Sequence, residues 1–454
     1  MSTLEDVLQL QQPIKDGGIR NVNFFNGRLL TGKDLSREQQ AHREADARLG
    51  LAIGDGVAFG LEAARDPDQD RPEAPVLRVR AGLAINRLGH TLRLNADTSV
   101  ALTRRFDGGE DGGDCQCVFA QCNPLADGVY VAGAGVYVLT IAPARQDEGR
   151  APSNGLDPGN VRCNTDATVE AVQFRLQAIN PLRFADLDPS SPLFRNRLAY
   201  RCFGIEARDA AAFDPWRVDP PSYGLIDELR PTGLSDCEVP LALVYWTAAG
   251  LRFVDTWSVR RRLLEPDALS GFSFQRNPLD PGELSSFAFL ARARRLVEAQ
   301  AMCAQFQQHL ADLLAATALP ATLRARDHFR YLPPFGVVPL QNLPLRGFGD
   351  AAFFQDIARR PLPGSGQQTQ FIDSRQIGAL QHQALAFSPT DSASGEYLWI
   401  YRPWQTVQAL SQGRGVQPLL VFACGQMPEM ALARFDLARA DFANYSSHSL
   451  FTVA

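Results

Sequence analysis

Hydrophobic positions change their period from helical to strand-like near residue 54. Residues 31–50 predict a charged helix, because Thr31 and Asp34 have the spacing of a capping box and Gly50 is a typical helix end. The apolar stripe of this helix runs through Leu35, Gln39, His42, Ala45 and Leu49. So thin a stripe makes a solitary helix marginal in water. We therefore expect it to lie against its own β-domain or a neighbouring subunit.

After residue 54, short runs alternate between apolar and polar side chains, which is the period of antiparallel strands with one buried face. Loops rich in Gly, Pro and Asp separate these runs. The longer predicted strands cover Gly135–Arg145, Val169–Ile179, Val239–Trp246 and Leu251–Trp257. Many strands with irregular loops predict a β-sandwich or jelly-roll-like body.

A second helical pattern covers residues 284–319 and is stopped by Pro320. Read in sevens, it gives two series of positions: Phe289, Leu296, Cys303 and Leu310, and Arg292, Ala299, Phe306 and Leu313. This spacing suits a coiled-coil seam that would join copies of the chain. An amphipathic helix that covers its own domain carries much the same stripe, so both interpretations stay open.

The last part of the chain begins with a Pro-rich extended stretch and contains two apolar strand-like runs, at residues 396–404 and 417–425. The predicted fold class is α+β and mainly β. Its predicted units are an N-terminal arm and helix, a β-sandwich body, a long helix and a small C-terminal α+β domain, over residues 1–50, 51–265, 266–331 and 332–454.

Composition narrows the class of protein. The 454 residues are 45% hydrophobic and 21% charged, which is typical of a folded chain with more than one domain. A net charge of -5 argues against nucleic acid as the main partner. The chain has no apolar run long enough to span a bilayer and no signal-peptide pattern. We expect a protein made in the cytoplasm without direct membrane insertion.

Three cysteines crowd into one loop-like stretch, and a fourth follows in the next. Cys115, Cys117, Cys122 and Cys163 could bind zinc through their thiolates, form disulfides that staple loops, or be ordinary loop cysteines. Their spacing is not a common structural-zinc pattern. No other metal or cofactor site is predicted.

Catalytic motifs are missing from the sequence, which has no nucleophile elbow, P-loop, zinc-protease helix or dinucleotide fingerprint. The acidic run at residues 66–70 lacks the Gly and Glu of a calcium loop and predicts a solvated loop. The sequence thus predicts a protein that is not an enzyme. A hydrolase that uses Asp66 or Asp373 remains an alternative, as does a carbohydrate-binding protein with Trp404 exposed.

The stretch NFFNGRLLTGKDLSREQQAHREADARLG, followed by GDGVAFGLE, resembles an N-terminal signature of tail and baseplate-associated proteins from contractile phages and phage-like contractile injection systems. The matching positions are Phe24, Phe25, Gly27, Leu29, Leu30, Thr31, Asp34, Glu38, Gly56, Val57, Gly60, Leu61 and Glu62. The resemblance covers about the first 100 residues and becomes patchy toward Leu264. The order of domains is also similar to that of a trimeric type VI secretion baseplate subunit that links the baseplate to another assembly.

This resemblance implies a structural component without catalytic residues, carried in a virion tail or phage-like particle at the baseplate or where fibres attach. Its expected partners are other tail or baseplate proteins, a tail fibre and further copies of the chain, with a trimer favoured. The residues expected at assembly interfaces are Phe24, Phe25, Leu29, Leu30, Leu35, Leu296, Phe306, Leu310 and Leu313. The alternative is a receptor- or carbohydrate-binding tail protein.

Overall fold

The architecture was analysed in a computed structural model. It describes residues 13, 15–72, 74–102, 133–149, 166–181, 184, 187–203, 224–230, 233–263, 281–317, 322–339, 345–346, 350–355, 357, 369–373, 376–385, 389–393, 398–404 and 419–423. The side chains of residues 281–295 are outside this description. Among the described helices, none is both long enough and apolar enough to cross a bilayer.

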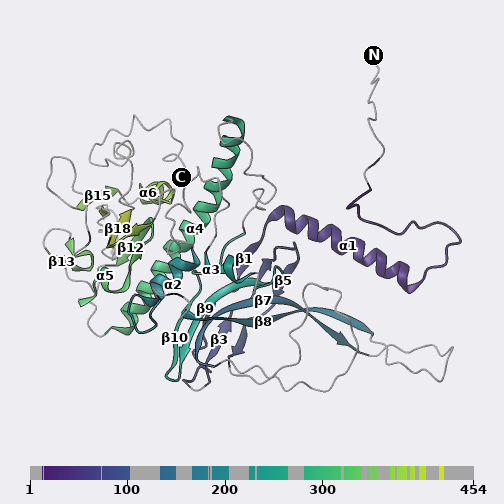
Figure 1. The fold of residues 1–454 in the computed structure, drawn as a ribbon, viewed down its shortest axis with the longest axis horizontal. Coiled ribbons are helices and arrows are strands. Elements are labelled where there is room, and N and C mark those ends of the chain that lie inside the picture. Colours follow the sequence, from purple (N-terminus) through teal and green to yellow (C-terminus); the bar gives the residue numbers. More distant parts are fainter. Residues whose placement is uncertain are drawn as a thin grey trace, which may run out of the picture.

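The fold is α+β and mainly β, as the sequence predicts (Figure 1). Helix α1 extends away from the rest of the molecule, and the long helix α4 runs between the β-rich body and the C-terminal elements (Figure 1). The helices are α1 Gly32–Ile53, α2 Phe194–Cys202, α3 Leu225–Leu229, α4 Pro281–Ala316, α5 Ala325–His328 and α6 Ile377–Ala384.

In the described residues, three antiparallel sheets form the body. The central sheet has the order β10-β9-β7-β8, with β7 Gly135–Glu148, β8 Ala167–Ile179, β9 Val239–Thr247 and β10 Gly250–Asp255. One small sheet contains β1 Gly56–Gly60, β4 Gly82–Ile85 and β5 Thr91–Leu94. The other contains β2 Ala63–Arg65, β3 Val76–Val79 and β6 Thr98–Ala101. The strands expected from residue 135 onward are therefore present.

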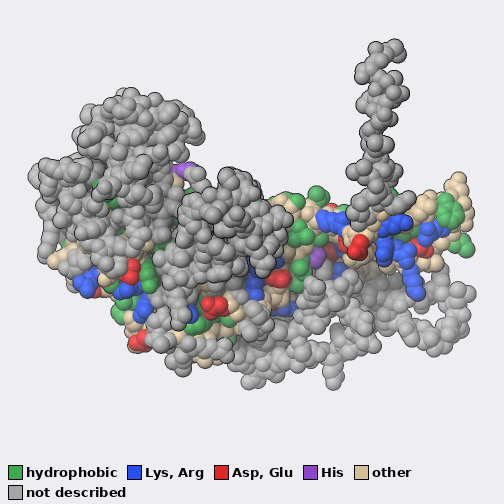
Figure 2. Space-filling view, turned by 45° about the horizontal axis from the view of Figure 1, so that its top comes forward, with side chains coloured by type: hydrophobic (Ala, Val, Ile, Leu, Met, Phe, Trp, Pro, Cys, Tyr) green, Lys and Arg blue, Asp and Glu red, His purple; other side chains and the backbone are tan. Residues whose placement is uncertain are grey.

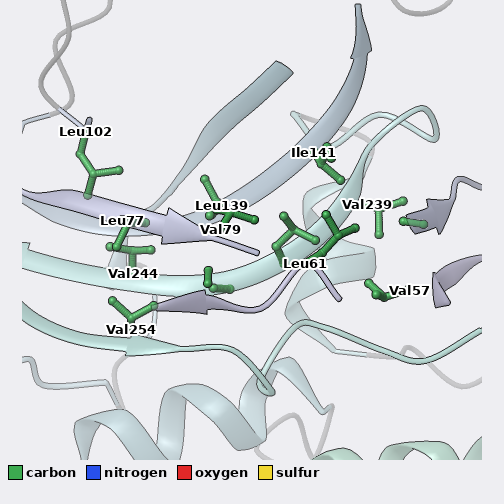
Figure 3. Packing of buried hydrophobic residues seen from close by; sticks show 14 of the residues in the cluster. Val57, Leu61, Leu77, Val79, Leu102, Leu139, Ile141, Val239, Val244 and Val254 are labelled. Carbon is green, nitrogen blue, oxygen red and sulfur yellow. The ribbon is translucent and has the colours of Figure 1, made fainter. Parts of the chain in front are cut away.

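The body core lies on both faces of the central sheet, because successive side chains of a strand point to opposite faces. Leu139 and Ile141 of β7 belong to one apolar cluster with Leu77 and Val79 of β3 and with Leu61, which lies between the two small sheets (Figure 3). On the other face, Val136 and Val138 of β7 pack with residues of α2 and α3. The first of these contacts is the sheet-on-sheet packing that the strand pattern predicts.

A left-handed turn joins the two small sheets. Gly60 and Leu61 have φ angles of 64° and 59°, a region that side chains other than glycine adopt rarely. A Cβ atom on Gly60 would lie 1.9 Å from the carbonyl oxygen of Ala81. The buried guanidinium of Arg260 donates a hydrogen bond to the Gly60 carbonyl. The GLE segment of the signature thus builds a turn inside the body.

The C-terminal elements pack around a mixed sheet of order β12-β18-β17-β15. Its strands are β12 Phe335–Pro339, β15 Thr369–Asp373, β17 Trp399–Trp404 and β18 Leu419–Ala423, and β15 pairs with β17 in parallel. Smaller elements flank it: β11 Tyr331–Leu332 with β16 Thr390–Asp391, β13 Leu345–Arg346 with β14 Asp350–Ala351, and the 3-10 helix η5 Ala352–Phe354.

Helix α4 covers this C-terminal sheet with the stripe that also suits a coiled coil. Ala299, Cys303, Phe306 and Leu310 are buried within the single chain. Leu296 is partly buried against the apolar cluster that contains Ala299 and Cys303, and Leu313 against the cluster that contains Phe306 and Leu310. The structure therefore shows an amphipathic helix on its own domain, and Phe306 and Leu310 retain no exposed surface for another copy. Phe289 and Arg292 are among the residues whose side chains are not described.

Charged and polar side chains join α4 to the body. Arg195 of α2 donates from Nε to Asp255 Oδ2 at 3.0 Å and from Nη1 to Asp312 Oδ2 at 2.7 Å. Gln305 of α4 donates to the same Asp255 oxygen at 2.9 Å. Burial, with smaller contributions from Arg195 and His328, holds the pKa of nearby His309 well below its ordinary value. This network fixes α4 between the two parts of the chain.

Candidate docking surface

Four large apolar side chains project from the loop that precedes α1. Phe24, Phe25, Leu29 and Leu30 are 54%, 62%, 90% and 51% exposed. Residues 23–31 are called the apolar loop below. All four side chains belong to the assembly interface that the sequence predicts. In Figure 2, hydrophobic and basic side chains gather at the end of the molecule that carries this loop and the start of α1.

Polar contacts within the apolar loop and with the first turns of α1 hold its backbone. The Val22 amide donates to Glu38 Oε2 at 3.0 Å. Arg28 donates from Nη1 to the Asn23 carbonyl at 2.7 Å and from Nη2 to Asp34 Oδ1 at 2.6 Å. Gly27 has a φ of 89°, which glycine adopts without strain. The loop is thus folded back on the helix start by its polar groups.

The predicted capping box is present at the start of α1. The Asp34 amide donates to Thr31 Oγ1 at 3.3 Å, and the Thr31 amide donates to Asp34 Oδ2 at 3.0 Å. Hydrogen bonds from Thr31, and then from Arg28, lower the pKa of Asp34 to about 2. A carboxylate at a helix start is further favoured by the helix dipole. Arg28, Thr31 and Asp34 therefore bond with one another at the helix start, while the large apolar side chains of the loop face solvent.

The apolar stripe of α1 faces solvent along most of its length, which differs from the expectation that it lies against the chain's own β-domain. Leu35, Gln39, His42, Asp46, Leu49 and Ile53 are all exposed, and these six are called the outer face of α1. The buried residues of the helix are Ala41 and Gly50, and Ala45 is half-buried. Whether a neighbouring subunit covers the outer face stays a prediction.

Gly50 is not the end of α1, although the sequence predicts it to be. The helix continues to Ile53, and Gly54, with a φ of 107°, closes it by donating to the Gly50 carbonyl at 3.0 Å. A Cβ atom on Gly50 would lie 2.0 Å from the Gly89 carbonyl oxygen. Gly50 is therefore needed for close packing of α1 on the turn before β5. A glycine in this sequence position is explained by that packing and not by a helix end.

Further contacts hold the other sides of α1. Arg48 donates to the Gly17 carbonyl at 2.5 Å, which ties the preceding segment along the helix. Arg43 Nε lies 3.7 Å from Oε1 of Glu170 in β8, and an exposed ion pair of this kind adds little stability. These contacts leave the outer face, with apolar residues toward its two ends and polar residues between them, uncovered by the described residues.

The predicted cysteine site lies outside the described residues, since Cys115, Cys117, Cys122 and Cys163 are not among them. Cys237 is disulfide-bonded. Cys303 is a free, buried thiol, and burial raises its pKa to about 12, so it is unreactive at neutral pH. The described residues contain no cluster of three or more His, Cys, Asp or Glu side chains that could hold a metal.

The acidic run at residues 66–70 is only partly the solvated loop that the sequence predicts. Asp66 is fully buried, and its carboxylate accepts hydrogen bonds from Ser99 Oγ at 2.6 Å and from the amides of Asp68 and Gln69. Those donors lower its pKa, with Ser99 the largest cause. Asp66 therefore has a structural role in a turn. Among the described contacts, no second carboxylate is hydrogen-bonded to it.

Comparisons with known proteins add little. No protein-family model and no curated protein matches the chain. Among solved structures, a crystal structure of TssK is similar over 70% of this chain, with 13% identity and a TM-score of 0.24. The match spans 64% of the TssK chain, just under two thirds of its length. A likeness at this TM-score carries no argument about fold or function.

Proposed function

We propose that this protein is a structural, non-enzymatic component of a contractile phage tail or phage-like injection particle, at the baseplate or the fibre-attachment region. It acts by protein–protein assembly with other tail or baseplate proteins and with further copies of itself, as a trimer. The observation that carries the proposal is the apolar loop, in which internal polar contacts fix the backbone and four large apolar side chains face outward.

The energetics of the loop favour docking. Full burial of one Leu or Phe side chain contributes roughly 1.5–3 kcal/mol, so a small group of them can anchor an interface. A loop that is already held in shape loses less entropy when it binds than a mobile one. Contacts of Arg28 with Asn23 and Asp34 therefore prepare the surface for a partner.

The sequence resemblance supports placing this docking function in a tail. Its signature residues in the first 40 positions fall into two groups. Gly27, Thr31, Asp34 and Glu38 shape the loop and the helix start, whereas Phe24, Phe25, Leu29 and Leu30 are the exposed side chains. A signature composed of a surface and the residues that build it is the pattern expected of an assembly element.

The alternative, a receptor- or carbohydrate-binding tail protein, requires exposed aromatic side chains in the C-terminal domain. In the described part of that domain, Trp399 and Tyr401 are buried. The side chain of Trp404 is outside the described residues. No observation among the described residues favours this second function.

The test uses particles purified on a gradient from the cells or phage that encode the protein. Mass spectrometry measures this chain against sheath and tube subunits. The wild-type chain is expected at a fixed ratio near a multiple of three or six per particle. Leu29→Asp with Leu30→Asp should reduce that ratio at least tenfold, because two carboxylates would have to be buried at the interface.

The matched control is Arg93→Asp, which makes the same change in net charge at an exposed residue of β5. It should enter particles at the wild-type ratio. Circular dichroism of each purified variant shows that the chain is folded. Absence of the wild-type chain from intact particles, or normal incorporation of the double variant, would overturn the proposal.

A further inference from the structure

We propose that the contact between α4 and α2 opens at mildly acidic pH, and that His309 is the side chain that makes it sensitive to acid. This contact joins the β-rich body to the C-terminal domain. It is separate from the apolar loop and α1, so the proposal does not depend on the docking function.

The side chain of Arg195 reaches residues on both sides of His309. On α4, Gln305 lies four residues before His309 and Asp312 lies three residues after it, a spacing that places all three on one face of the helix. Arg195 donates from Nη1 to Asp312 Oδ2 at 2.7 Å. Its Nε donates at 3.0 Å to the Asp255 oxygen that also accepts from Gln305. The guanidinium of Arg195 therefore lies across the turn of α4 that carries His309.

The ring of His309 is buried in a place that does not suit a positive charge. The residue is 4% exposed, and its ring centroid lies 4.7 Å from that of Phe329. Among the described residues, its Nδ1 atom has no hydrogen-bond partner. A protonated ring carries an N–H on both nitrogens, so Nδ1 would become a buried donor without an acceptor.

The charges around the ring also oppose its protonation. The charged or titratable side chains of the neighbouring elements are Arg195 of α2, Asp255 of β10, Asp312 of α4, and Arg326, Asp327 and His328 of α5. Arg195 occupies both Asp255 and Asp312. Burial, then Arg195, then His328 hold the pKa of His309 well below its ordinary value of 6.5.

The sign of the pH effect follows from this difference. In the closed contact His309 is neutral, whereas in an opened contact its ring reaches water and binds a proton near the ordinary pKa of 6.5. Acid therefore favours the opened contact, and the effect is absent above pH 6.5. One such group raises the equilibrium constant for opening by up to about tenfold for each pH unit, or about thirtyfold at pH 5.0.

The contact opens on the side of the body. On the other side of α4, Phe306 belongs to the apolar cluster of the C-terminal domain. On the body side, Gln308 donates to the Val254 carbonyl at 2.8 Å, a hydrogen bond that water can replace. Exposing an aromatic ring to water costs more than exchanging such a bond. The opening concerns residues 305–316, beyond the apolar contact that α2 makes near Met302.

The test is amide hydrogen exchange of the full-length chain at pH 7.5 and pH 5.0, corrected for the intrinsic effect of pH on exchange. Protection of α2 and of residues 305–316 should fall by up to about thirtyfold at pH 5.0, while β7 and β9 keep theirs. His309→Gln should keep the same protection at both pH values, because the amide does not titrate. The matched control is His42→Gln, at an exposed histidine of α1, which should behave as the wild type.

A second measurement needs no variant. Slow deuterium exchange at the ring Cε1–H, read by mass spectrometry of peptides, gives a pKa for each of the six histidines of the wild type. The midpoint of His309 should lie below 6.5 and below that of His42. This result, with the loss of protection in α2 and α4, supports the proposal even if His309→Gln does not fold.

Three outcomes would overturn the proposal. Unchanged protection of residues 305–316 between the two pH values would show that acid does not open the contact. The same loss in His309→Gln as in the wild type would assign the effect to another group. A midpoint of His309 at or above 6.5 would show that the closed contact accepts the charged ring.

Discussion

Helices α1 and α4 carry apolar residues at the same kind of spacing, yet among the described residues only the stripe of α4 is covered by its own chain. Phe306 and Leu310 of α4 are buried among aromatic residues of the C-terminal domain. Leu35 and Leu49 of α1 are exposed. The comparison shows that a stripe indicates which side of a helix will be covered, whereas the surrounding fold decides what covers it.

The difference follows from what each helix meets. Strand β12 has Gly336 at the point where α4 crosses, and a Cβ atom there would lie 2.4 Å from the Phe422 ring and 3.2 Å from the Phe306 ring. The missing side chain lets large aromatic rings of α4 and the sheet pack together. On α1, the glycine Gly50 packs closely on Gly89 of the body, and the large apolar residues Leu35 and Leu49 remain exposed.

The difference between α1 and α4 is tested most strongly by truncating a side chain at the centre of the α4 stripe. Phe306→Ala should lower the free energy of unfolding by about 3–5 kcal/mol, because it leaves a cavity in a close-packed core. Phe306 has ring contacts with Phe329 at 4.9 Å and Phe422 at 5.3 Å between centroids. Urea denaturation followed by circular dichroism measures the change.

A loss below about 1 kcal/mol for Phe306→Ala would contradict the buried position of this side chain. In that case the seam of α4 would again be available to a second copy, as one of the two interpretations of the sequence requires. The oligomeric state of the variant, measured in parallel by sedimentation, separates the two readings of α4.

Local patterns in the sequence predicted the elements well. The capping box at Thr31 and Asp34 is present, and α4 spans Pro281–Ala316 where the pattern predicts 284–319. The strands of the central sheet follow the alternating runs. These features depend on residues within a few positions of each other, which is the range over which spacing is informative.

Contacts between distant residues could not be predicted in this way. Asp255 and Asp312 are 60 and 117 residues from Arg195, and no local spacing connects them. The role of Gly50 depends on Gly89, so the usual helix-end meaning of glycine was wrong there. The sequence also assigned Phe306 and Leu310 to an assembly interface, whereas the chain itself buries both, because a stripe does not reveal its own neighbours. The interface role of the four exposed side chains of the apolar loop stays a prediction.

A smaller expected effect tests whether the packing of Gly50 on Gly89 holds α1 in place. Gly50→Ala should destabilise the protein by about 1–3 kcal/mol, because the added Cβ atom would overlap the Gly89 backbone. Helix propensity by itself predicts the opposite sign, a gain of about 1 kcal/mol. The matched control is Gly32→Ala in the same helix, where a Cβ atom meets nothing within 4 Å. Thermal and urea unfolding of both variants compare the two effects.

Gly32→Ala should leave stability unchanged or raise it slightly. Gly50→Ala as stable as that control would show that α1 does not pack closely on the turn at Gly89. Among the described contacts, the helix would then be attached to the body through its C-terminal end and the Arg43–Glu170 pair. Packing at Gly50 would no longer explain why the outer face is exposed.

The smallest expected effect is also the most direct contrast with Phe306. Leu35→Ala with Leu49→Ala should change the free energy of unfolding of the dilute protein by no more than about 0.5 kcal/mol, as is usual for surface substitutions. Both side chains are already in water, and Ala has the higher helix propensity. A loss above about 1.5 kcal/mol in dilute solution would mean that the chain itself covers Leu35 or Leu49. Both α1 and α4 would then be covered by their own chain.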